Sequence, residues 1–290
     1  MSIDLSNKGK GVFYLNFIQY GDGTNKADVT QNFNFSNLVD QAGTYIIAIE
    51  RLNLPLQRIP MINALAPAMT FESTDPFELN FTINIDAVYS WKEFEESINI
   101  SLGEVQAIVA YIALDFSGRI KIYNNKWNDY NIRLSQTLMD IFDLPELIGI
   151  NDTDSNGFII GKSSIVDRFD QLHKIQVESI GMNVQQEILD TDRSLPIITD
   201  LIVPTNYSFS YAEPLEDDQA ASANINVGYT VRQDLTYISE SERRYVMLRG
   251  NTPIQNIRIL CVAIFKDGSR NEIILPPRSV FECKIAFFRR

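Results

Sequence analysis

The sequence has few of the side chains on which most enzymes and metalloproteins depend. Its 290 residues include one histidine, His173, and two cysteines, Cys261 and Cys283. A single histidine excludes most Ser-His-Asp, Cys-His and polyhistidine metal arrangements, unless His173 itself is the base. A lone histidine is usually an ordinary packed or surface residue. We therefore predict no catalytic role for His173.

The short motifs of nucleotide-binding proteins and esterases are missing as well. No G-x-S-x-G occurs, so the nucleophile elbow of the esterases has no support. Gly9-Lys10-Gly11 is too short for a phosphate-binding loop and precedes a strand pattern instead of a helix. Glu93, Glu95 and Glu96 lie on one predicted helix, where their spacing fits a solvated face better than a cleft of paired acids. We predict no enzyme, no catalytic residues and no cofactor site.

One string resembles a calcium-binding loop. Asp152-Thr153-Asp154-Ser155-Asn156-Gly157 places oxygen ligands at alternate positions and glycine at the sixth. The twelfth position is Ser163, where a calcium loop needs a bidentate glutamate. Asp and Asn also make local backbone hydrogen bonds in turns. We favour a polar turn over a calcium site and predict no metal ligand.

Basic residues and long apolar runs are scarce. Lys and Arg number 25 against 37 Asp and Glu, giving a formal net charge of −12, which disfavours direct binding to nucleic acid. No uninterrupted apolar stretch reaches the roughly 18 residues of a membrane span. Residues 1–7 lack the charged and apolar regions of a secretory signal. We expect a product kept in a reducing interior, with Cys261 and Cys283 as reduced core thiols on adjacent strands.

What the sequence does contain is the alternation of β-strands. Val280–Phe288 places Phe281, Cys283, Ile285 and Phe287 on one face. Ile254–Phe265 is a similar apolar strand, and Asp267-Gly268 after it predicts a tight hairpin to Asn271–Leu275. Further strands are predicted at Val12–Tyr20, Thr44–Leu52, Phe77–Val88, Leu172–Val184 and Leu195–Val203. The density of β-branched residues in Thr44–Leu52 indicates burial on both faces of that strand.

Two short helices interrupt this pattern. Ser90 and Glu93 form a predicted capping box before an apolar stripe that begins at Trp91, and Ser135 is predicted to cap a helix that ends before Pro145. About a dozen strands with two helices predict an all-β sandwich or barrel. We expect an N-terminal arm at residues 1–11, one β-rich half at 12–150 and a second at 151–290, with a composition change near 145–170.

Three stretches resemble the jelly-roll penton and minor capsid proteins of the adenovirus-like, virophage and Polinton-type virus lineage. The first is an early strand, then Thr44–Arg51 and a proline-rich exit through Ile59-Pro60. The second is the helix containing Ser97–Ile100, followed by a strand pair and by the segment from Leu134-Ser135 to Phe142–Leu144. The third is the C-terminal part, which comprises Arg244–Leu248, Pro253–Ile257, Asp267-Gly268 and Lys284–Phe287.

This resemblance implies a jelly-roll β-sandwich and a virion protein without catalytic residues. It further implies that the chain assembles into a ring, most simply a homopentamer, inside the host cell. This ring would lie at the capsid vertices beside a larger major capsid protein. One jelly roll needs fewer than 290 residues. An inserted or second β-domain must therefore account for the rest. The alternative within this class is a major capsid protein with two tandem jelly rolls, which would form trimers.

A second class of function is a receptor- or carbohydrate-binding module. Trp127-Asn128-Asp129-Tyr130 is the best local candidate, with Tyr211 as another exposed aromatic, because aromatic and amide groups together suit sugars; a buried tryptophan is the commoner case. The N-terminal part also contains several apolar residues outside the clear strand patterns: Phe33, Phe35, Leu38, Leu54, Leu56 and Met61. They fit equally an arm that orders against a neighbouring subunit and a plug for their own sandwich.

Overall fold

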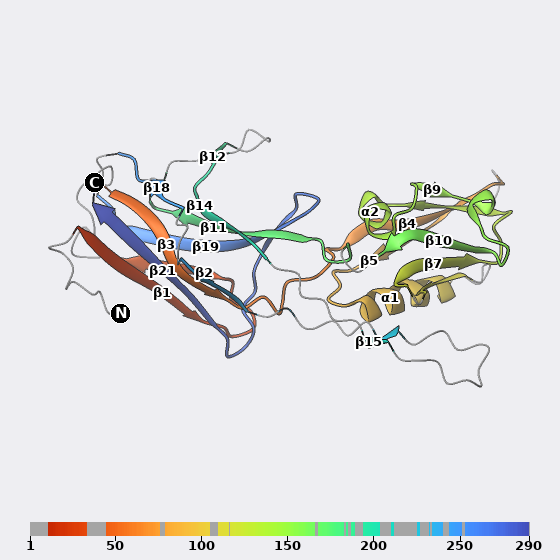
Figure 1. The fold of residues 1–290 in the computed structure, drawn as a ribbon, viewed down its shortest axis with the longest axis horizontal. Coiled ribbons are helices and arrows are strands. Elements are labelled where there is room, and N and C mark those ends of the chain that lie inside the picture. Colours follow the sequence, from red (N-terminus) through yellow and green to blue (C-terminus); the bar gives the residue numbers. More distant parts are fainter. Residues whose placement is uncertain are drawn as a thin grey trace. The chain divides into compact units, whose positions relative to one another are not determined.

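A computed structural model of the protein shows two compact units (Figure 1). It describes residues 11–33, 45–75, 79–104, 110–115, 117–165, 168–182, 184, 187–188, 194–203, 210–211, 225–226, 232, 234–239, 244–250 and 253–289. Unit 1 comprises Met1–Ile59, Leu172–Pro204 and Val231–Arg290, and unit 2 comprises Pro60–Gln171 and Thr205–Thr230. Residues 1–10 of the predicted arm lie outside the described residues.

Unit 1 is a β-sandwich of two antiparallel sheets. The first, called here the β1 sheet, has the order β1-β21-β3-β17, with β18 also paired to β3. The second, the β11 sheet, has the order β14-β11-β19-β2, with β20 also paired to β19. The strands are β1 (Val12–Tyr20), β2 (Asp28–Asn32), β3 (Tyr45–Leu54), β11 (Leu172–Ile180), β14 (Ile197–Ile202), β17 (Leu235–Ile238), β18 (Val246–Met247), β19 (Asn256–Phe265), β20 (Arg270–Glu272) and β21 (Val280–Arg289).

The strand order of unit 1 is that of a jelly roll. Numbered along the chain, its eight main strands lie in the orders 1-8-3-6 and 2-7-4-5. Apart from β11 to β14, each connection between consecutive main strands crosses from one sheet to the other. Two interlocked Greek keys of this kind define the jelly roll. The predicted jelly-roll sandwich with a β-rich insertion and two helices is confirmed.

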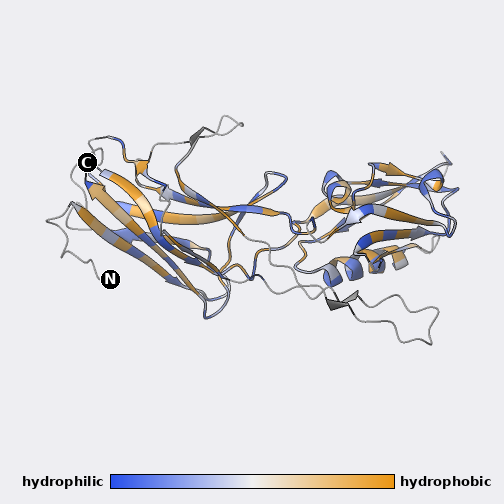
Figure 2. Cartoon of the chain, in the orientation of Figure 1, coloured by the Kyte–Doolittle hydropathy of each residue, from blue (hydrophilic) through white to orange (hydrophobic). Residues whose placement is uncertain are grey.

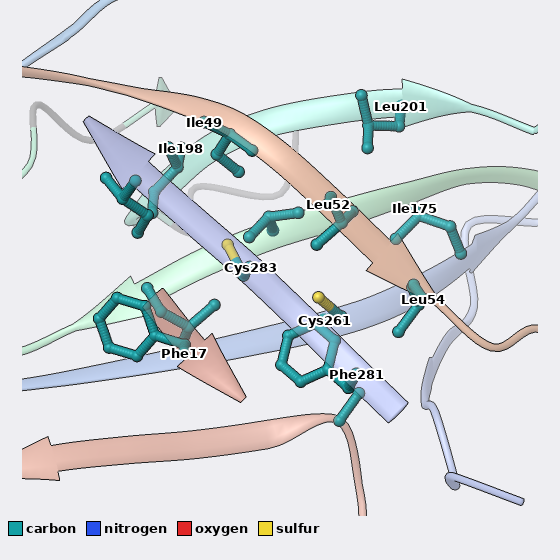
Figure 3. Close-up of a cluster of buried hydrophobic side chains, with 14 of the residues drawn as sticks. Phe17, Ile49, Leu52, Leu54, Ile175, Ile198, Leu201, Cys261, Phe281 and Cys283 are labelled. Carbon is teal, nitrogen blue, oxygen red and sulfur yellow. The ribbon is translucent and has the colours of Figure 1, made fainter. Parts of the chain in front are cut away.

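The core of unit 1 lies between the two sheets. Phe281, Cys283, Ile285 and Phe287 all point into it with no exposed surface, which confirms the alternation predicted for the last strand. Both cysteines are free, buried thiols in this core, as predicted (Figure 3). Their predicted placement on adjacent strands is wrong. Cys261 belongs to the β11 sheet and Cys283 to the β1 sheet, because the jelly roll sends the chain across the sandwich between β20 and β21.

Unit 2 is built from two larger sheets and the two helices. Its three-stranded sheet has the order β10-β7-β6, and its four-stranded sheet the order β5-β4-β8-β9. The elements are β4 (Leu65–Ser73), β5 (Phe81–Ile85), α1 (Trp91–Glu104), β6 (Ala110–Leu114), β7 (Arg119–Asn124), β8 (Tyr130–Leu134), α2 (Gln136–Phe142), β9 (Leu147–Ile148), the 3₁₀ helix η3 (Ile150–Asp152) and β10 (Phe158–Ser164). A two-stranded pair of β15 (Ser210–Tyr211) with β16 (Ile225–Asn226) also belongs to unit 2, whereas the pair of β12 (Glu187–Ile188) with β13 (Ser194–Leu195) belongs to unit 1.

Both helices begin as predicted, with one difference. The Ser135 hydroxyl accepts the N–H of Leu138 and caps α2. The Ser90 hydroxyl accepts the N–H of Glu93, whereas the Glu93 carboxylate accepts the N–H of Tyr89, one residue before the predicted partner. Helix α1 covers a sheet edge: the Asn99 side chain accepts the N–H of Ile112 at 2.8 Å and donates to its carbonyl at 3.0 Å. The side-chain amide of Asn99 thus makes the two backbone hydrogen bonds that a neighbouring strand would otherwise make with Ile112 of β6.

The units divide the chain at other positions than the sequence analysis predicted. The predicted boundary between residues 150 and 151 lies within unit 2, which continues to Gln171. Unit 1 draws on three separate stretches of chain because jelly-roll strands pair across long sequence separations. The larger sheets of unit 2 contain three and four strands, not the eight strands of a second jelly roll. The alternative of two tandem jelly rolls is therefore wrong for the described part of the chain.

Candidate assembly surface

The outer face of the β1 sheet is unusually apolar at one end. The strand register places Val12, Phe288, Ile46 and Met247 in one row across β1, β21, β3 and β18. The next row contains Tyr14, Ala286 and Ala48. These side chains alternate with the buried core residues of the same strands, so they point away from the sandwich core. We call Val12, Tyr14, Ile46, Tyr245, Met247 and Phe288 the apolar end.

Two aromatic side chains of the apolar end contact each other. The rings of Tyr245 and Phe288 meet edge to face with centroids 5.5 Å apart. The Lys284 ammonium lies 4.6 Å from the centroid of the Tyr14 ring, at the boundary with the polar part of the sheet. Tyr245 and Met247 remain exposed over 53% and 43% of their surface. In Figure 2, hydrophobic segments recur along the strands of unit 1, between hydrophilic ones.

The rest of the same face is more polar. Asn16, Lys284 and Arg51 form a row in register, and Ile18, Glu282, Asn53 and Thr236 form the next. Arg51 and Glu282 approach within 4.0 Å. The outer face of the β1 sheet therefore has an apolar end and a charged middle. An antiparallel sheet that met only water would be expected to present polar residues along its whole outer face.

The outer face of the β11 sheet carries several ion pairs. Arg258 donates to both oxygens of Asp28, and Arg270 donates to Glu178 at 2.5 Å. Lys174 lies 3.2 Å from Asp200. Glu178 is only 4% exposed, so its charge is compensated by this close guanidinium. Apolar residues lie on this face as well: Val262 is in register with Gln176, and Ile202, which is 80% exposed, is in register with Lys174. This face therefore mixes ion pairs with apolar side chains.

His173 lies on the surface. It is exposed on β11, where the register with β19 shifts between Leu172 and Lys174. A histidine placed in this way is consistent with the surface residue that we predicted.

The calcium-like string forms a turn. Asp154 accepts the backbone N–H groups of Asn156 and Phe158, both at 2.9 Å. Asp152 accepts the N–H of Gly149 at 2.9 Å, and Gly157 has a φ of 78°. The string therefore forms a turn that is held by local side-chain to backbone hydrogen bonds. Within the described ranges, the structure contains no cluster of three His, Cys, Asp or Glu side chains that could hold a metal ion.

The three glutamates of α1 have separate local roles. Glu93 caps the start of the helix, and Glu96 lies 3.7 Å from Lys92. Glu95 accepts the indole N–H of Trp91 at 3.1 Å, and burial raises the pKa of its carboxyl group. The structure does not bring them together as a catalytic pair.

The aromatic rings of the candidate carbohydrate site at Trp127–Tyr130 are both buried, which is the commoner case for a tryptophan, so they offer no surface on which a sugar could stack. Trp127 and Tyr130 are each only 6% exposed. The Trp127 indole donates to the carbonyl of Gly157 at 2.8 Å, and Tyr130 packs edge to face on Phe81. Only Asn128 and Asp129 of this string reach the surface. The side chain of Tyr211 lies outside the part that the structure describes.

The apolar residues of the N-terminal part belong to the cores of their own chain. Leu54 and Leu56 are buried in unit 1, Phe33 packs against that core, and Met61 is buried in unit 2. For these residues the intrachain plug is the correct alternative. Phe35 and Leu38 lie outside the described residues.

The apolar end was not predicted as a site from the sequence. One signal for it was present: burial on both faces was expected for the strand that contains Ile46 and Ala48. None of the helices in the described ranges is long and apolar enough to cross a membrane.

Comparisons with known proteins agree with this fold. No family model and no curated protein matches the chain. Among solved structures, the mavirus penton protein matches 96% of this chain and 99% of its own, with a TM-score of 0.61 and 14% identity. A chain from the cryo-EM structure of the Sputnik virophage matches with a TM-score of 0.57 and 14% identity, over 96% and 98% of the two chains. The resemblance to virophage-type capsid proteins is thus confirmed for the fold: this chain shares the architecture of the mavirus penton protein over almost its whole length.

Proposed function

We propose that this chain is a structural protein of a virus capsid, a vertex subunit that assembles into a closed ring and contacts a major capsid protein. The observation that carries this proposal is the similarity in fold to the mavirus penton protein over 96% of the chain. The similarity includes the insertion between the third and fourth jelly-roll strands, because it extends over both units. A protein that shared only a jelly roll would match unit 1 alone.

The apolar end supports assembly through the β1 sheet. A ring requires heterologous contacts, in which one surface of a subunit meets a different surface of its neighbour. The apolar end offers one such surface, since its rows of Val12, Phe288, Ile46 and Met247 would gain from removal of water. We propose a homopentamer, as expected for a capsid vertex, in which residues 1–11 form an N-terminal arm.

Electron microscopy of the purified full chain tests this proposal. Negatively stained particles are expected to give class averages of closed rings with fivefold symmetry. Threefold particles would favour a different capsomer, and single particles of one chain at micromolar concentration would contradict a self-assembling vertex subunit. A virion location follows from the proposal and is checked by mass spectrometry of purified virus particles.

A further inference from the structure

The outer face of the three-stranded sheet of unit 2 carries a row of aromatic side chains. Tyr111 on β6 is in register with Tyr123 on β7, which is in register with Phe158 on β10. The rings of Tyr111 and Tyr123 lie 5.2 Å apart between centroids, and those of Tyr123 and Phe158 lie 5.3 Å apart. Their neighbours along the strands, Ile112, Ile122 and Ile159, are buried in the core of unit 2. The three aromatic rings therefore lie on the outer side of the sheet.

Cations accompany these rings. The second row of this face contains Ala113, Lys121 and Ile160, and the Lys121 ammonium lies 4.3 Å from the centroid of the Phe158 ring. No described carboxylate lies within 4.0 Å of that ammonium, so Lys121 has no ion-pair partner in the part of the chain that the structure describes. Lys162 is exposed on β10, and Arg119 on β7 pairs with Asp115.

The charge of this sheet is opposite to that of the whole chain. Strands β6, β7 and β10 contain Arg119, Lys121 and Lys162 and no aspartate or glutamate. The whole chain has a formal net charge of −12. Cross-strand aromatic pairs alone would be explained as sheet stabilisation. Sheet stabilisation does not explain why these three strands contain no carboxylate. It also does not explain why the Lys121 ammonium lies over the Phe158 ring, close to the partly exposed Tyr111 phenol.

We propose that this face of unit 2 is a binding site for a short anionic saccharide, carrying sulfate or carboxylate groups. The sugar ring would stack on the aromatic row, the Tyr111 hydroxyl would hydrogen-bond to it, and Lys121 would pair with its anionic group. Charge complementarity argues for the anionic class, because the Lys121 ammonium has no carboxylate partner in the described part of the chain and can pair with an incoming anion. This proposal does not depend on the capsid role of the chain.

A saccharide fits this surface better than a single-stranded nucleic acid does. Proteins that bind single-stranded nucleic acid offer a separate aromatic ring face for each successive base and a basic groove for the phosphates. Here the rings contact one another, with interplanar angles of 31°, 46° and 72°, and form one compact cluster.

The test is a titration of the full-length protein with four probes of similar length. These are a heparin-derived sulfated hexasaccharide, an oligogalacturonate hexamer, a neutral cello-oligosaccharide and an oligo(dT) strand, each measured by calorimetry at two salt concentrations. At least one anionic saccharide is expected to bind, more weakly at higher salt, and the neutral sugar is expected to bind at least about tenfold more weakly. Equal binding of the neutral sugar, tighter binding of oligo(dT), or no saccharide binding at millimolar concentration would overturn the proposal.

Two variants locate the site on this face. Lys121→Gln keeps most of the side-chain length and removes the charge, and Tyr111→Phe keeps the ring and removes the hydroxyl. The first is expected to weaken saccharide binding by about tenfold and the second by about threefold. Lys126→Gln is the matched control, since Lys126 lies in the same unit in the turn after β7, and it is expected to bind as the unmodified protein does. Unchanged binding by Lys121→Gln, with an unchanged melting temperature, would refute the assignment.

Discussion

Replacing Met247 by Glu tests whether copies of this chain contact one another through the apolar end. Met247 lies on β18 beside Ile46, in the row that also contains Phe288 and Val12. It is 43% exposed in the single chain, so a glutamate there keeps much of its access to water. We therefore expect the free energy of unfolding to change by no more than about 1 kcal/mol.

The effect on assembly is expected to be larger. Burying a methionine completely contributes roughly 1.5–3 kcal/mol, and somewhat less than half of this surface is still exposed, so its loss costs about 1 kcal/mol per contact. An unpaired carboxylate against the apolar row costs about 2 kcal/mol more. Together these terms weaken each contact by roughly a hundredfold, since 1.4 kcal/mol corresponds to a factor of ten.

Analytical ultracentrifugation measures this effect directly. The unmodified chain is expected to remain assembled at concentrations at which Met247→Glu sediments as single chains. Leu147→Glu is the matched control, because Leu147 is an apolar residue of unit 2 with the same exposed fraction of 43%. If Met247→Glu folds normally and stays fully assembled, the apolar end is not a contact between copies.

Three further predictions concern the packing and charge of each unit. Gly161→Ala should lower the stability of unit 2 by about 2 kcal/mol by calorimetry, because an added Cβ would lie 2.3 Å from the Phe142 carbonyl oxygen. Gly103→Ala, in α1 with open space around it, should be neutral or stabilise by up to about 1 kcal/mol, and a destabilisation equal to that of Gly161→Ala would contradict this packing. Burial raises the pKa of both Cys261 and Cys283. The two neutral thiols contribute fully to the free energy of unfolding below the thiol pKa of the unfolded chain, near 9. Above that pH the unfolded chain ionises first, so the free energy of unfolding falls by about 1.4 kcal/mol per pH unit for each thiol. Equal urea midpoints at pH 8 and pH 10 would contradict buried thiols. Glu95→Gln should stabilise unit 2 at pH 7, since the pKa of Glu95 is raised, and a gain that persists unchanged at pH 4 would refute that cause.

Strict alternation made the long strands of unit 1 predictable. In Val280–Phe288 every second residue is apolar and buried, and the observed strand differs from the prediction by one residue at its end. Strands without this pattern were missed. Leu65–Ser73 contains Pro67, which is unfavourable inside a strand, and Asp28–Asn32 has Val29 as its one apolar residue. Both strands form because neighbouring strands pair with their backbones: β5 and β8 with the first, and β19 with the second. The side chains of these two strands do not indicate this pairing.

Tertiary contacts decided the remaining differences. Leu79 continues the alternation before β5 but is 87% exposed, because β5 begins only at Phe81. Cys261 and Cys283 lie close in sequence, which favoured adjacent strands, whereas the jelly-roll topology places them in facing sheets.

The candidate surface was only partly predictable. Apolar residues on both faces of Thr44–Leu52 indicated double burial, and the structure places the outer face of this strand within the apolar end. Which surface of a neighbour covers that face depends on a second chain, so no pattern within one chain specifies it. The aromatic row of unit 2 shows the same limit, because Tyr111, Tyr123 and Phe158 are adjacent only through strand pairing.

The central claim is that this chain is a self-assembling vertex subunit. The most direct test is the solution mass of the purified full chain, measured by light scattering on a sizing column over a wide range of concentrations. The claim predicts one discrete species with five times the chain mass of 33.0 kDa. A mass of one chain at every concentration and salt would contradict it.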